Sequence, residues 1–258
     1  MRVTSYETIG PVTRERWNTN TVARIDEVDS FSELLTAVDS LRGKYAPARL
    51  LCSLDGVGQC QYTSIHASFD DRLGYEEHEF EEDDFTAAHH ADNAHIDRIA
   101  AVLDDPDLRV EWEALAGTRN GDGAETDVKA LVEVNRQPDR AVDEVVVVQR
   151  VPVSRDDLAL VGIPNGYFEG DWDTFQNHAM ARRMAIHGYR HIGTGASLLG
   201  FDRPTAPTSE QAQAVVADLA SLYGAPDSSA WSELATTLCG QRILLIGYTE
   251  DFADTLDI

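Results

Sequence analysis

Three short apolar runs constrain the fold of this chain more than any other feature. They cover residues 48–54, 145–148 and 242–248 and read ARLLCSL, VVVV and RILLIGY. Runs of this length that are rich in Val, Ile and Leu are typical of strands buried on both faces, whereas a membrane-spanning helix needs about 20 apolar residues. We therefore expect a central sheet whose faces are covered by other elements, and no contact with a membrane.

Segments in which apolar residues recur at helical intervals lie between these runs. Ser30 and Glu33 precede one such segment, and Thr208 and Gln211 precede another, with the spacing of a capping box. Asp171 is expected to cap the helix formed by a third such segment. Helices are predicted at residues 30–43, 84–103, 172–187, 208–224 and 228–238.

Alternating or β-branched stretches predict further strands. They lie at residues 2–6, 21–25, 61–68, 108–112, 128–134 and 191–201. Several are joined by loops, as in an antiparallel meander, so we expect an α/β or α+β fold with a mixed or antiparallel sheet and about five covering helices. The chain forms either a single domain or two packed subdomains, an N-terminal α+β unit at 1–142 and a C-terminal α/β unit at 143–258.

The charge of the chain is strongly negative: 45 carboxylates oppose 21 cationic side chains, and the formal net charge is −24. Lys44 and Lys129 are the only lysines. This composition resembles that of proteins from halophiles that accumulate salt, in which an acidic surface holds hydration. At 1 M salt the Debye length falls to about 3 Å, so the self-repulsion is screened. We interpret the charge as a sign of habitat, and we expect no bulk binding of nucleic acid.

The sequence contains no motif that is diagnostic of catalysis. Cys52, Cys60 and Cys239 lack the spacing of a zinc ribbon or a disulfide framework, so reduced thiols are expected. No G-x-S-x-G elbow occurs, and the glycines of GTGASLLG are not placed like a dinucleotide fingerprint. The N-terminus lacks the apolar stretch of a signal peptide. We therefore predict a cytoplasmic protein without a cofactor, and a non-enzymatic role is favoured over an enzymatic one.

Residues 172–203 form the segment where the acidic chain reverses its charge, with four arginines against two aspartates. On a helical wheel Gln176, Arg183 and His187 form one row between two apolar faces, so they are expected to point inward. A buried guanidinium needs a partner. That partner is either an anionic ligand, with His187 available as an acid or base, or an internal carboxylate such as Asp202.

Two glycines follow that helix on one face of a predicted strand. Gly193 and Gly195 leave room for a flat ligand or for the close approach of a helix or another backbone. The predicted ligand-binding residues are Gln176, Arg183, His187, Gly193 and Gly195.

A metal site is the weaker alternative, built on His89, Asp92 and His95 of one helix. His89 and His95 are about 9 Å apart along the helix axis, too far to bind one ion together. His89 with Asp92, or Asp92 with His95, would need a further ligand such as His66 or His78.

These observations predict a small-anion-binding or protein-interaction module, and they leave a homo-oligomer open. The alternative is an enzyme in which Arg183 holds an anionic substrate and His187 transfers a proton. A metal-dependent hydrolase that uses His89 and Asp92 is a third and more remote hypothesis.

Overall fold

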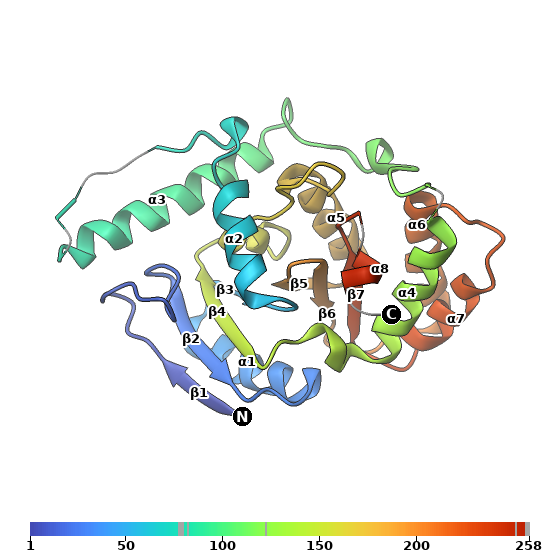
Figure 1. Cartoon of the computed structure of the whole chain (residues 1–258), viewed down its shortest axis with the longest axis horizontal. Coiled ribbons are helices and arrows are strands. Elements are labelled where there is room, and N and C mark those ends of the chain that lie inside the picture. The colour runs from blue at the N-terminus through green and yellow to red at the C-terminus, as the bar shows by residue number, and fades with distance from the viewer. Residues whose placement is uncertain (77–79, 82, 122, 251, 256–258) are drawn as a thin grey trace.

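The computed structural model describes residues 1–76, 80–81, 83–121, 123–250 and 252–255. Within them, seven strands form one mixed sheet in the order β1-β2-β4-β3-β5-β6-β7 (Figure 1). The strands are β1 (Arg2–Ser5), β2 (Thr21–Asp26), β3 (Arg49–Ser53), β4 (Val145–Val151), β5 (Arg190–Thr194), β6 (Leu198–Asp202) and β7 (Ile243–Gly247). β3 and β5 are parallel, and the other neighbouring pairs are antiparallel.

Helices cover this sheet. They are α1 (Phe31–Tyr45), α2 (Val57–Ala67), α3 (Phe85–Asp104), α4 (Ala124–Arg136), α5 (Thr174–Ile186), α6 (Ser209–Tyr223), α7 (Ala230–Leu238) and α8 (Phe252–Thr255). α4, α6 and α7 pack together at the β7 end of the sheet, whereas α3 packs against a 3-10 turn at Asp157–Gly162 (Figure 1). The predicted class of fold is therefore confirmed.

The capping signals in the sequence correspond to real helix starts. Ser30 Oγ accepts a hydrogen bond from the backbone N–H of Glu33 at 3.2 Å, and α6 opens with the predicted capping box. In α5 the prediction is wrong by two residues, because Asp173 is the N-cap in place of Asp171. Gln176 completes that capping box, and this fixes the start of the helix.

Three predicted strands are wrong. Residues 61–67 lie in α2 and Ser68 is its C-cap, residues 128–134 lie in α4, and residues 108–112 form no strand. In α4 the buried Val128, Leu131, Val132 and Asn135 recur at helical intervals, and this period outweighs the preference of valine for strands. The predicted strand at 191–201 is the hairpin of β5 and β6.

β4 follows the predicted boundary at residue 143 and lies between β2 and β3. The sheet is therefore continuous across that boundary, and the division into 1–142 and 143–258 stays a prediction. In the described part of the chain, no helix combines the length and the apolar content that crossing a bilayer requires.

Candidate functional site

Two residues of the predicted polar row, Arg183 of α5 and His187 at its end, contact a carboxylate of α6. Arg183 donates from Nε and from a terminal nitrogen to the two oxygens of Asp218, each at 2.6 Å, and His187 Nε2 lies 2.5 Å from Asp218 Oδ2. Burial opposes ionisation of Asp218, but the hydrogen bonds from Arg183 and His187 hold its pKa below the ordinary value. The internal partner is thus Asp218 and not Asp202, while Gln176 serves the helix cap.

A hollow of about 480 Å³ adjoins this ion pair, and Arg183 lies over the ring of Trp112 there. Four arginines and four carboxylates line this hollow. Because the charges are equal in number, the hollow offers an anion no net attraction.

The two predicted glycines accommodate the protein itself. A side chain at Gly193 would lie 2.7 Å from Leu54, and one at Gly195 would lie 1.7 Å from Asp55 Oδ1. Residues after β3 therefore occupy the space that these glycines leave. The five predicted ligand-binding residues contact different parts of the protein, and their role with a ligand stays a prediction.

The predicted metal ligands on α3 are partly engaged by the segment before β2. Asp92 Oδ2 accepts from the backbone N–H of Thr19 at 2.8 Å and from its hydroxyl at 2.5 Å. Since that hydroxyl donates to Asp92, the Nδ1 of His89, 3.0 Å away, donates to it in turn. Burial and the nearby Arg150 lower the pKa of His89. Among the described residues, which exclude His78, no three His, Cys, Asp or Glu side chains converge as metal ligands.

A different set of residues forms a positively charged pocket at the start of the parallel strands. Cys52 of β3 pairs with Gly193 of β5, so Arg49 and Arg190, each three residues earlier, stand at the same level of the sheet. Arg42, in the last turn of α1, joins them. We call this hollow of about 290 Å³ the arginine pocket; Arg42, Arg49, Arg190, His191 and Asp156 contribute its polar walls.

Asp202 lies beside this pocket and holds the guanidinium groups of Arg42 and Arg190, whereas Arg49 pairs with Asp156 at 2.5 Å and donates to the carbonyls of Pro47 and Ser154, each at 2.8 Å. Asp202 is fully buried and accepts from Arg190 at 2.5 and 3.1 Å, from Arg42 at 3.2 and 3.3 Å, and from Arg242 at 3.3 Å. Asp39 pairs with Arg42 and lies 3.9 Å from Arg242. Three guanidinium groups thus share two carboxylates, which leaves one positive charge in excess.

His191 lines the arginine pocket and carries a hydrogen-bond acceptor that has no partner among the described residues. Its Nε2 lies 2.9 Å from the carbonyl oxygen of Gly193, which can only accept, so Nε2 carries the proton and Nδ1 is bare. The side chain is 4% exposed, and Nδ1 has no partner among the described residues. Burial lowers the pKa of His191 to about 4, so the imidazole is neutral near pH 7.

A shallower hollow of about 700 Å³ shares the wall at residues 46–49 and adds Lys44 and Arg150. Five cationic side chains and one carboxylate of the described chain line the two hollows together, although the whole protein carries −24. Cationic side chains outnumber carboxylates here even when Asp39, Asp202 and the nearby Arg242 are counted.

Comparison with known protein families, curated proteins and solved structures finds no match, so the function is argued from this geometry.

Of the arginines that line this pocket, only Arg190 lies in the cationic segment 172–203 that stands out in the sequence. The sequence does contain a pattern that predicts this pocket. Arg49 and Arg190 are the first residues of β3 and β5, and Arg242 immediately precedes β7. In a chain with so few cations, arginines repeated at strand starts indicate one positively charged edge of the sheet.

Proposed function

We propose that the protein binds a small organic oxyanion in the arginine pocket. The observation that supports this most is the environment of His191. Its bare Nδ1 is buried without a partner among the described residues, and His191 lines the same hollow as three arginines. An unsatisfied buried acceptor costs about 1–3 kcal/mol, and a ligand that donates to it would offset this cost.

The chemistry of the walls narrows the class of ligand. Guanidinium groups favour a carboxylate or a phosphate, and the bare Nδ1 requires a donor. A hydroxycarboxylate or a phosphate monoester that carries a hydroxyl group meets both needs. The volume of about 290 Å³ is at the lower end of that of ligand pockets, so the ligand is small.

Binding is favoured over catalysis in this pocket. A pKa of about 4 makes His191 a weak base near neutral pH. The enzymatic alternative on Arg183 and His187 has less support, because Asp218 engages both side chains and the hollow beside them has as many carboxylates as arginines. The metal-dependent hydrolase has less support as well, because Thr19 already donates twice to Asp92.

Calorimetric titration in about 1 M KCl, which screens exposed charges, tests the proposal. Glycolate and acetate are the matched probes, since they differ by one hydroxyl group. We expect glycolate to bind more tightly than acetate, and the variant Arg49→Gln to bind glycolate about tenfold more weakly through loss of a charge-assisted hydrogen bond.

Arg98→Gln on α3 is the control, because Arg98 bonds Glu76 and the carbonyl of Gly74 outside the arginine pocket. It should bind glycolate like the wild type. Equal affinity of Arg49→Gln and wild type, or no heat with glycolate or inorganic phosphate, would overturn the proposal.

A further inference from the structure

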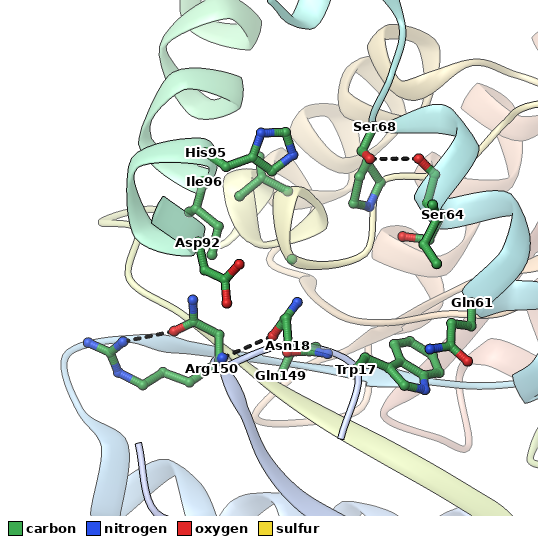
Figure 2. Close-up of a pocket in the computed structure, with 15 residues that line it drawn as sticks. Trp17, Asn18, Gln61, Ser64, Ser68, Asp92, His95, Ile96, Gln149 and Arg150 are labelled. Atoms are coloured by element: carbon green, nitrogen blue, oxygen red, sulfur yellow. Dashed lines mark hydrogen bonds between the residues drawn. The ribbon is translucent and has the colours of Figure 1, made fainter. Parts of the chain in front are cut away.

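A second hollow lies between α2, α3 and the segment that precedes β2. Figure 2 shows Asp92 and His95 of α3 on one side, Ser64 and Gln61 of α2 on the other, and Gln149 of β4 beneath them. We call it the polar pocket. Its volume is about 120 Å³, which is the room of about four water molecules.

Gln149 lines this pocket and carries an unsatisfied acceptor. The side chain is 1% exposed, and its Nε2 donates to Thr21 Oγ1 at 3.0 Å. This bond directs Oε1 away from Thr21, and Oε1 has no partner among the described residues. A buried amide oxygen in that state needs a donor, and the polar pocket is the open space beside it.

Asp92 supplies a second acceptor. Both hydrogen bonds from Thr19 go to Oδ2, so they fix the carboxylate and leave Oδ1 for another donor. In Figure 2 the carboxylate points into the space above Gln149. Two acceptors from different elements thus face one small volume.

The charged side chains around the polar pocket disfavour a cationic ligand. Arg150 donates to Asn20 at 3.2 Å, and Arg16 donates to the carbonyl of Thr19 at 2.9 Å. These two cations outweigh the single negative charge of Asp92, so an added positive charge would be repelled. A neutral donor meets no such penalty.

We propose that the polar pocket binds a small neutral primary amide, whose two N–H groups donate to Gln149 Oε1 and Asp92. The ligand has about four non-hydrogen atoms, as the volume requires, and its carbonyl faces the hydroxyl of Ser64. This site is independent of the arginine pocket and of the function proposed for it.

Saturation-transfer NMR with acetamide and acetone tests this proposal, since the two molecules have nearly the same shape and acetone has no N–H. We expect acetamide to bind at least about tenfold more tightly, which corresponds to the loss of two hydrogen bonds. Gln149→Met should abolish acetamide binding. It should change the midpoint of thermal unfolding little, because the loss of the hydrogen bond from Nε2 to Thr21 is offset by the removal of an unsatisfied buried oxygen.

A second variant keeps the test valid if Gln149→Met does not fold. The larger side chain of Ser64→Leu would fill the pocket from the partly exposed face of α2, so this variant should not bind acetamide. Gln59→Leu, on the exposed face of the same helix, is the control and should bind acetamide like the wild type. Equal signals from acetamide and acetone, or undiminished acetamide binding in Ser64→Leu, would overturn the assignment.

Discussion

Asp55 shows how a single buried residue can couple stability to pH. It follows β3, its Oδ2 accepts from the backbone N–H of Ser197 at 2.8 Å, and its Oδ1 has no partner among the described residues. Burial raises its pKa to about 7, and the hydrogen bond from Ser197 only partly opposes this rise. Gly195 has to be glycine because any side chain there would collide with this carboxyl group.

The pKa of Asp55 predicts a loss of stability between pH 4 and pH 7. The folded protein holds this proton more tightly than the unfolded chain, whose aspartates titrate near pH 3.9, so the contribution is complete below about pH 4 and is lost as the pH rises through 7. The loss is on the order of 4 kcal/mol. Urea unfolding across this range should show a flatter profile for Asp55→Asn than for the wild type.

Asp29→Asn, at an exposed aspartate, should leave that profile unchanged. Parallel profiles for the wild type and Asp55→Asn would contradict the assignment.

The triad of Arg183, His187 and Asp218 predicts a structural cost of mutation. Arg183 is 33% exposed and Asp218 13% exposed, so the pair is partly screened and Arg183→Ala should lower the free energy of unfolding by about 1–2 kcal/mol. Arg136→Ala removes an arginine from exposed pairs and should cost less than about 0.5 kcal/mol. Denaturant titration of both variants checks this, and equal effects would contradict it.

That Arg183 and His187 share one partner could be predicted, because residues four apart lie on one helical face. The identity of the partner could not, since Asp218 and Asp202 are equally plausible until the packing of α5 against α6 is known. Asp202 instead pairs with Arg42, Arg190 and Arg242, whose separation in sequence hides their proximity.

Among the elements, α4 was the hardest to predict, since its sequence resembles a strand, and it has a specific structural role at the edge of the sheet. Its Asn135 is fully buried, donates to the carbonyl of Leu245 at 2.8 Å and accepts from the N–H of Leu245 at 2.8 Å. It therefore satisfies backbone groups of β7, which ends the sheet. The valines of α4 suggested a strand because a single sequence does not show that this segment covers an edge.

Asn135→Ala should lower the free energy of unfolding by about 3 kcal/mol, because both backbone groups of Leu245 lose a buried partner. Thermal and denaturant unfolding measure this loss. Thr237→Ala on α7, whose exposed hydroxyl bonds only within its own helix, is the control and should change stability by less than about 0.5 kcal/mol. A loss no larger than that of the control would contradict the role of Asn135 at the sheet edge.

Across the whole molecule, the sequence predicts the total charge and the class of fold but not where the cations gather. The positions of strands and helices depend largely on local sequence patterns, and these patterns were enough to predict most of the elements. The arginine pocket arises from the parallel register of β3 and β5 together with the end of α1, and such register depends on tertiary structure.

The net charge of −24 predicts that salt stabilises the fold. Raising KCl from about 0.1 M to about 1 M shortens the Debye length from about 10 Å to about 3 Å and screens the repulsion among carboxylates. The midpoint of thermal unfolding should therefore rise over this range. A midpoint that is constant or falls would contradict the interpretation of the charge as an adaptation to salt.

The central claim, that an oxyanion with a hydroxyl group binds in the arginine pocket, is tested most directly by the nitrogen chemical shifts of His191. In the free protein Nδ1 should show the shift of a bare nitrogen and Nε2 that of a protonated one. Saturating glycolate should move the Nδ1 resonance towards that of a hydrogen-bonded acceptor, whereas acetate should move it much less. A protonated Nδ1 in the free protein, or an Nδ1 resonance that glycolate leaves in place, would contradict the account.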